Sequence, residues 1–266
     1  MTNDKRLKTK LKILQIITLG EAGGAQKHLL SLVNGLSSDK RPKTSAFRLP
    51  TFDLTVVCGG RGELLSKVRP GIKKIHLNEL VREISPLKDL SALIKLYRLI
   101  RKEKFDIVHT HSSKAGIIGR LAAKLAGVKV ILFTAHGFVF QEPSFFLKKL
   151  FYYWAEKISA LWTTCIITVS KNDAQIARKL CSPHKIVTIH NGLDIKLFTS
   201  SRKNSMLIKK LGLDQKKPII GTVANFYKTK GLEYLIQAVS KMKEVQPLSS
   251  FVIIGDGRER PKLEKL

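Results

Sequence analysis

Short apolar runs alternate with longer amphipathic segments along the first 190 residues of the chain. The runs are rich in Ile and Val, which is typical of strands that are buried on both faces of a parallel sheet. Predicted strands cover residues 13–18, 54–58, 74–77, 107–110, 129–134, 166–170 and 186–190. Predicted helices cover residues 25–36, 86–102, 114–126, 145–161 and 172–180. This alternation predicts an α/β domain with a doubly wound, Rossmann-like parallel sheet.

The pattern weakens after residue 193 and then starts again. A strand is expected from Ile219, a helix over residues 232–243, a strand over 251–254 and a last helix near Arg258. Two parallel strands cannot bury both of their faces, so this second Rossmann-like domain is expected to be incomplete. We therefore predict a first domain over residues 1–195, a basic linker over 196–217 and the start of a second domain over 218–266. Residues 39–53, which are basic and contain Pro, are predicted to form an exposed loop.

The charge of the chain is far from balanced, with 48 Lys and Arg against 20 Asp and Glu and a formal net charge of +28. Such an excess favours an anionic partner, which could be phosphates, an acidic membrane surface or nucleic acid; a general role in solubility is the alternative. No nucleic-acid-binding motif accompanies the charge, so nucleic acid is not expected as a partner.

The three cysteines, Cys58, Cys165 and Cys181, are far apart and form no CxxC pair. Neither a disulfide framework nor a zinc site is supported, and a reducing cytoplasm fits best. The basic start followed by LKILQIITL resembles a secretory signal, but Gln15 and Thr18 interrupt the apolar run, and we expect a first core strand. No stretch reaches the ~20 apolar residues that span a bilayer.

Two strand–loop–helix units have the form of phosphate-binding sites, one with Gly23 and Gly24 in its loop and one with Lys230 and Gly231. Backbone N–H groups and a helix N-terminus point at such a loop and favour an anion. Gly23 and Gly24 allow a positive φ and close backbone approach. The first loop is not GxGxxG, which argues against an NAD enzyme. Lys228 and Lys230 precede a helix and could hold a diphosphate, although such lysines are also plain surface charges.

Polar residues follow several predicted strands at the sheet edge where ligands gather. His109 and His111 are two apart and share a face. A metal site would need further ligands, which the sequence does not group with them, so one is expected to be structural and the other to line a cleft. His136, followed by Gly137, is a candidate for touching a substrate, with a structural role as the alternative. Asn191 and Gly192 form a predicted turn that Asp194 can cap.

These segments, taken in order, resemble a known family. The series GGA, HTH, TxHG, ITVS, HNGLD, xxxKG and IIGDGRER is similar to that of family-four glycosyltransferases with the GT-B fold, and the resemblance runs from Lys12 to the last residue. It is closest to members that build bacterial cell-surface polysaccharides. It implies retaining transfer of a sugar from a nucleotide sugar to a lipid-linked or saccharide acceptor, with no metal and no other cofactor. A UDP-sugar is favoured over a GDP-sugar.

The resemblance also implies roles for individual residues. His136 would contact the donor sugar and Lys230 would neutralise the leaving diphosphate, and these two are the expected catalytic residues. The expected donor-binding residues are Gly23, Gly24, Asn191, Gly192, Asn225, Lys228 and Lys230. The expected acceptor-side residues are His111, Ser112 and Lys114.

The chain departs from the family pattern in two places. Ala224-Asn225-Phe226 stands where the family has Gly-Arg-Leu, so the arginine partner of Lys230 is absent. The family's E-x7-E segment and its final helix would follow beyond Leu266. We therefore expect a chain truncated at its C-terminus and inactive by itself; a non-catalytic membrane- or acceptor-binding module is the alternative.

The expected location is the cytoplasm, with the inner face of the plasma membrane as a peripheral site. Lys and Arg residues near an anionic membrane each add ~1 kcal/mol of attraction. The segment FFLKKLFYYWAEKISALW, residues 145–162, combines aromatic residues with lysines and could touch the membrane. A core helix of the first domain is the other interpretation of this segment.

Overall fold

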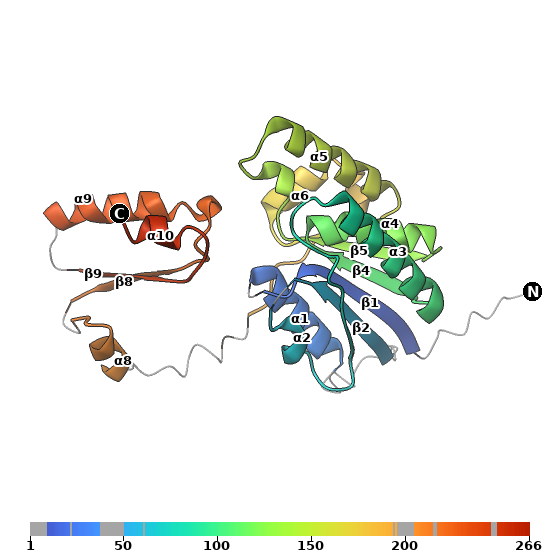
Figure 1. The fold of residues 1–266 in the computed structure, drawn as a ribbon, viewed down its shortest axis with the longest axis horizontal. Coiled ribbons are helices and arrows are strands. Elements are labelled where there is room, and N and C mark those ends of the chain that lie inside the picture. Colours follow the sequence, from blue (N-terminus) through green and yellow to red (C-terminus); the bar gives the residue numbers. More distant parts are fainter. Residues whose placement is uncertain are drawn as a thin grey trace, which may run out of the picture. The chain divides into compact units, whose positions relative to one another are not determined.

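The computed structural model of the protein describes residues 10–21, 23–37, 51–60, 62–193, 195, 205–214, 217–245 and 249–266. The chain divides into two compact units, Met1–Gly192 and Leu193–Leu266 (Figure 1). The division falls three residues before the predicted end of the first domain at residue 195. The second unit contains the predicted linker, in which residues 205–210 form helix α8 (Ser205–Lys210).

The first unit is built on a seven-stranded sheet with the order β3-β2-β1-β4-β5-β6-β7, and every neighbouring pair of strands is parallel. Its strands are β1 (Lys10–Leu19), β2 (Thr51–Gly59), β3 (Lys73–His76), β4 (Ile107–His111), β5 (Val130–Ala135), β6 (Cys165–Thr168) and β7 (Ile186–Thr188). All seven strands were predicted from the apolar runs, and the Rossmann-like fold class is confirmed.

Helices cover both faces of this sheet. They are α1 (Gly24–Leu36), α2 (Leu64–Lys67), α3 (Pro86–Glu103), α4 (Ser113–Leu125), α5 (Phe146–Leu161) and α6 (Lys171–Ala177), with short 3-10 turns η1 (Val139–Gln141) and η2 (Pro183–Lys185). Side chains of β1 alternate between the two faces. Ile13 and Ile17 pack with α1 and α2, whereas Leu14 and Ile16 pack with α3 and α4. A third core cluster, around Phe133, lies beneath α5 and α6.

One ion pair lies wholly inside this unit and joins α4 to α5. Arg120 donates to the Glu156 carboxylate, and the two side chains are 0% and 1% exposed. The guanidinium also donates to the Gly116 carbonyl at 2.8 Å and stacks over the Phe133 ring, 4.1 Å from its centroid. Burial raises the pKa of Glu156, and the attraction of Arg120 acts in the opposite direction. The pair therefore depends on both partners being present.

The second unit is smaller and has a parallel pair of strands, β8 (Ile219–Val223) and β9 (Ser250–Ile254). The remaining elements are the 3-10 turn η3 (Lys228–Lys230) and the helices α9 (Leu232–Val245) and α10 (Arg260–Leu263). Apolar side chains of its strands are exposed, for example Val223 at 79% and Ile254 at 55%. The predicted order of strand, helix, strand and helix in this part of the chain is confirmed.

Two local predictions were wrong or incomplete. Residues 51–53 do not belong to the predicted loop: β2 begins at Thr51, which pairs with Lys10, because β1 extends far enough to offer a partner. The other residues of that predicted loop, 39–50, lie outside the described part of the chain. The short helix α2 was not predicted, because four residues are too few to show a helical period.

Candidate functional site

The candidate site lies where the strand order of the first unit reverses. The chain runs outward from β1 to β2 and β3 on one side, and from β4 to β7 on the other. In open α/β sheets, ligands bind at the carboxyl ends of the strands beside this switch point. Gly23 and Gly24 follow β1, His111 ends β4 and His136 follows β5. The fold therefore brings together three of the segments that the sequence singled out.

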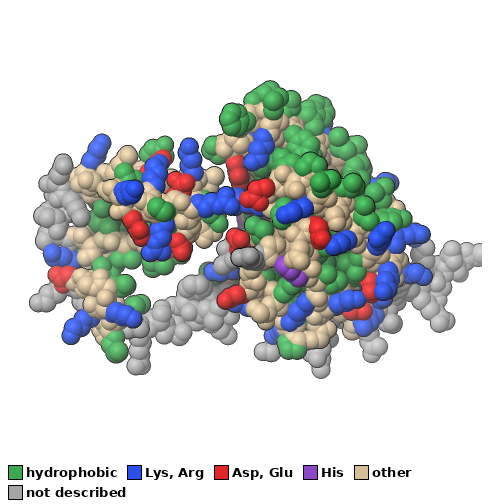
Figure 2. Space-filling view, viewed as in Figure 1, with side chains coloured by type: hydrophobic (Ala, Val, Ile, Leu, Met, Phe, Trp, Pro, Cys, Tyr) green, Lys and Arg blue, Asp and Glu red, His purple; other side chains and the backbone are tan. Residues whose placement is uncertain are grey.

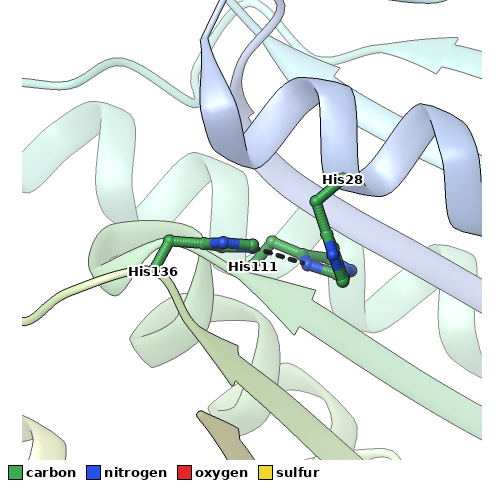
Figure 3. Close-up of side chains that lie close together, drawn as sticks. All are labelled: His28, His111 and His136. Carbon is green, nitrogen blue, oxygen red and sulfur yellow. Dashed lines mark hydrogen bonds between the residues drawn. The ribbon is translucent and has the colours of Figure 1, made fainter. Parts of the chain in front are cut away.

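Three histidines meet at this edge. Nitrogen atoms of His28, His111 and His136 all lie within 4.8 Å of one another, as Figure 3 shows. The Nδ1 atom of His111 is 3.4 Å from Nε2 of His136, and the ring of His28 packs edge-on against that of His136 with centroids 4.9 Å apart. The sequence groups no further ligands with His111, and the fold supplies them from α1 and from the loop after β5.

His28 was missed by the sequence analysis. It lies one turn into α1, four residues after Gly24. Helical side chains lean toward the helix N-terminus, so this one reaches back over the strand ends. The signal that could have revealed His28 is its position, because a histidine four residues after the glycine that begins α1 lies one turn from the carboxyl end of β1.

Hydrogen bonds beneath the cluster fix its orientation. Nε2 of His111 lies 2.8 Å from Oε1 of Gln15, and His109 Nε2 lies 2.7 Å from Oγ1 of Thr134. An amide oxygen only accepts, so Nε2 of His111 carries the proton and its Nδ1 keeps a lone pair. His109 thus makes the structural hydrogen bond predicted for one member of the pair. His111 is 0% exposed, so it faces the cluster rather than open solvent.

All four imidazoles are neutral at pH 7. Burial lowers the pKa of His109 to about 3 and that of His136 to about 4, and the repulsion that each would feel from a protonated His28 contributes less. Burial also places the pKa of His111 well below its ordinary value. For His28, burial lowers the pKa and a hydrogen bond to the Asn191 side chain opposes it. Neutral rings can donate and accept hydrogen bonds and can ligate metals, but they carry no charge for a diphosphate.

Asn191, a predicted donor-binding residue, joins the site through that hydrogen bond to His28. Asn191 and Gly192 are both exposed, and Gly192 is the last residue of the first unit. The predicted cap Asp194 lies outside the described residues.

The glycine loop differs from its prediction in backbone conformation. Gly23 has a φ of −173° at the start of α1, and Gly24 is already helical, so neither uses the left-handed region. A Cβ atom added at Gly24 would meet no described atom within 4 Å. Close approach of a ligand stays a prediction for this position. The left-handed glycine of the site is instead Gly137, with a φ of +99°, which turns the chain directly after His136.

Two of the predicted acceptor-side residues are held by protein partners. Ser112 has φ 65° and ψ 153°, a region in which residues other than glycine are strained. Its hydroxyl is held 2.7 Å from Oγ1 of Thr18, and that oxygen accepts a hydrogen bond from the Ala115 N–H in the first turn of α4. Lys114 is buried and pairs with Asp89 on α3 at 2.6 Å. Their direct contact with an acceptor stays a prediction.

In the second unit, the remaining predicted residues lie together after β8. Asn225, Lys228 and Lys230 are all exposed. Lys228 and Lys230 lie in η3, and Gly231, with a φ of +61°, leads into α9, so the predicted lysine–glycine–helix order is confirmed. The neighbouring loop after β9 approaches so closely that a Cβ at Gly255 would lie 1.9 Å from the Ala224 carbonyl oxygen.

Within the described residues, the three histidines are the one group of His, Cys, Asp or Glu that is arranged to hold a metal ion. The three cysteines are free thiols, and burial raises the pKa of Cys58 to about 11. None of the described helices is both long enough and apolar enough to cross a bilayer.

Solved structures share this fold. The chain matches Anabaena HepE in complex with UDP and glucose with a TM-score of 0.73 and 17% identity, over 96% of this chain and 64% of that one. It matches a sucrose-phosphate synthase from Thermosynechococcus elongatus with a TM-score of 0.70 and 18% identity, over 96% of this chain and 66% of that one. These neighbours confirm the GT-B arrangement of the elements.

Sequence relatives are more similar. An Escherichia coli UDP-Gal:alpha-D-GlcNAc-diphosphoundecaprenol alpha-1,3-galactosyltransferase is 36% identical over 238 residues, which cover 88% of this chain and 62% of the relative. The Staphylococcus aureus capsular polysaccharide biosynthesis glycosyltransferase CapM is 30% identical over 61% of this chain and 44% of its own length. The chain thus spans less than two thirds of the length of these relatives.

Family comparisons cover both units. Residues 204–266 match the family described as Glycosyl transferases group 1. Residues 22–197, about two thirds of the chain and including His28, His111 and His136, match Glycosyltransferase Family 4, and the chain therefore belongs to this family.

Proposed function

We propose that the chain is part of a retaining glycosyltransferase that moves a hexose from a nucleotide sugar to a lipid-linked or saccharide acceptor in bacterial surface-polysaccharide synthesis. The observation that carries this proposal is the cluster of His28, His111 and His136 at the switch point of a family-four sheet. The Escherichia coli relative supports UDP-galactose as the donor class and a diphospholipid-linked sugar as the acceptor class.

His136 is proposed to contact the donor sugar as a neutral ring. With its pKa lowered to about 4 by burial, it can donate to or accept from a sugar hydroxyl at pH 7. It cannot supply positive charge to the leaving diphosphate. That charge would come from Lys230, aided by Lys228 and by the N-terminus of α9, an electrostatic form of catalysis that requires no cofactor. Metal-free retaining transfer remains part of this proposal.

The 266-residue chain by itself is proposed to be inactive, because the E-x7-E carboxylates expected of the family are not among its residues. The test is to incubate the purified chain with UDP-galactose, other UDP-sugars and GDP-sugars together with a diphospholipid-linked GlcNAc analogue. We expect no transfer, with the intact Escherichia coli relative as the positive control. Transfer at a rate comparable to that of the relative would refute the proposed inactivity.

Helix α5 supports a peripheral membrane location as a second part of the proposal. One face of α5 is buried, through Tyr152 and Ala160. The other face exposes large apolar side chains, with Phe146 at 73% and Leu147 at 77%, and Phe145, directly before the helix, is 91% exposed. In Figure 2, apolar side chains gather over the region where Figure 1 labels α5. The buried face agrees with the core-helix interpretation of this segment, and the exposed face supports the proposed membrane contact.

Positive charges accompany this apolar face. Lys148 is exposed in the first turn of α5, and the Lys157 ammonium lies 5.1 Å from the centroid of the Trp154 ring. An apolar face flanked by lysines fits the boundary of an anionic bilayer. We propose that this face rests on the inner leaflet, where a lipid-linked acceptor would be available, and that a chain without turnover could still act as a membrane- or acceptor-binding module.

Liposome co-sedimentation tests the membrane contact. We expect binding to vesicles that contain anionic lipid, weaker binding at high salt and little binding to zwitterionic vesicles. The double variant F146S/W154S should lose most of this binding. The control L125S removes an apolar side chain of α4 that is 58% exposed, between Trp154 at 50% and Phe146 at 73%, and should retain the binding. Equal sedimentation of the two variants would refute a role for α5.

A further inference from the structure

We infer that His28, His111 and His136 form a binding site for a divalent transition-metal ion, with Zn²⁺ as the ion they suit best. Imidazole nitrogen suits zinc, copper, iron and nickel, and three histidines with one open position are a known zinc ligand set. The three ligands come from α1, β4 and the loop after β5, so the fold and not a local sequence motif creates the group (Figure 3).

The distances support this inference. Zinc–nitrogen bonds of 2.0–2.1 Å at tetrahedral angles place two ligand nitrogens about 3.3 Å apart. Nδ1 of His111 and Nε2 of His136 already lie 3.4 Å apart. A nitrogen of His28 lies within 4.8 Å of both. His28 supplies this third nitrogen from a partly exposed side chain on α1.

The surroundings orient the ligands as metal sites require. A ligating histidine usually donates its second ring N–H to a neighbouring group, which fixes the lone pair that faces the ion. Gln15 serves His111 in this way, with its Oε1 atom 2.8 Å from Nε2, so Nδ1 is left for the metal. The ring of His28 is held by a hydrogen bond to the Asn191 side chain.

The site is open to solvent on one side. His111 is fully buried, whereas His28 and His136 are both partly exposed, so an ion can enter between them. The open fourth position would hold water. A bound ion would occupy the His136 nitrogen that is proposed to contact the donor sugar, so metal and sugar would compete; this last clause rests on the proposed function.

Titration with Co²⁺ tests the site directly on the 266-residue chain, because tetrahedral Co²⁺ absorbs visible light strongly and reports its own ligands. We expect one equivalent of Co²⁺ to bind with a tetrahedral spectrum and to be displaced by Zn²⁺. Either H28Q or H136Q should weaken binding by more than ~100-fold, because each removes a direct ligand, whereas loss of a group behind a ligand costs about 10–100-fold. The variant Q15L should fall in that lower range.

The matched control is H184Q, which removes an exposed histidine on η2 that bonds to Ser182 and leaves the cluster intact. Circular dichroism confirms that each variant is folded. An absence of tetrahedral absorption, or equal affinity in H28Q, H136Q and H184Q, would overturn the inference. A thiolate charge-transfer band would also overturn it, because it would assign the ion to a cysteine. The readout needs no turnover, so its failure and that of the proposed transferase activity are distinguishable.

Discussion

The two strand–loop–helix units of this chain look alike in sequence and differ in how the protein surrounds them. The loop after β1 lies beside a histidine network in which the buried His111 and His109 are hydrogen-bonded to Gln15 and Thr134, and the partly exposed His28 to Asn191. The loop after β8 carries exposed lysines on a two-stranded sheet whose apolar side chains face solvent. A strand–loop–helix unit that resembles a phosphate-binding loop therefore identifies a position in the fold. The side chains around the loop, and how deeply they are buried, decide which interactions a ligand can make there.

The largest contrast between the units concerns their ion pairs. Replacing Arg120 with Met leaves Glu156 buried without its partner and should lower the free energy of unfolding by about 3–5 kcal/mol. Replacing Lys262 with Met breaks its pair with Glu233, but that lysine is 55% exposed, and the unfolding midpoint should hardly change. Urea denaturation of both variants measures this difference. Equal losses of unfolding free energy in the two variants would contradict the claim that the first ion pair is buried and the second is exposed to solvent.

Gly255, in the loop after β9, and Gly24, where the loop after β1 leads into α1, provide the next contrast between the two units. An Ala at Gly255 places its Cβ 1.9 Å from the Ala224 carbonyl oxygen, so the loops after β8 and β9 must separate. We expect the second unit to lose about 3 kcal/mol of stability, as overpacking does. An Ala at Gly24 meets no described atom within 4 Å, and its effect on stability should stay within about 0.5 kcal/mol. Amide hydrogen exchange measures the stability of each unit separately. A large loss of stability in G24A would show that the loop after β1 is packed against the protein.

The histidine cluster predicts a pH dependence for the first unit. Burial lowers the folded-state pKa of His136 from 6.5 to about 4, so its contribution to stability is present above pH 6.5 and is lost as the pH falls toward 4. Between pH 7 and 4.5, the wild type should lose about 2 kcal/mol more than H136Q, which cannot take up this proton. Urea denaturation across this pH range measures the difference. Identical pH profiles would mean that His136 titrates normally.

The smallest expected effect concerns the exposed lysines. Replacing Lys230 with Ala should weaken UDP binding by about tenfold, because an exposed ammonium is screened by solvent even when it contacts a diphosphate. Lys209 on α8 is the control, and K209A should not change the affinity. Isothermal titration with UDP measures both. An effect of K209A as large as that of K230A would reduce the role of Lys230 to general surface charge.

The sequence predicts most of the fold, because strands buried on both faces leave unmistakable apolar runs and the helices between them keep their period. It also places Gly24, His111 and His136 at strand ends, which brings them to one edge. It does not reveal His28 or Gln15 as members of the site, since their contacts join α1 and β1 to β4 across some 80 to 96 residues of sequence. The conformation of Gly23 and the buried partners of Lys114 likewise depend on packing, which periodicity does not report.

Histidine side-chain NMR of the 266-residue chain, with resonances assigned through H136Q and H184Q, tests the central claim most directly. The account predicts that His136 is neutral at pH 7 and that its ring signals shift when UDP-galactose and a diphospholipid-linked GlcNAc analogue are added, while those of His184 stay in place. A charged His136 at pH 7, or ligand-induced shifts as large at His184 as at His136, would contradict the assignment of the histidine cluster as the substrate-facing site.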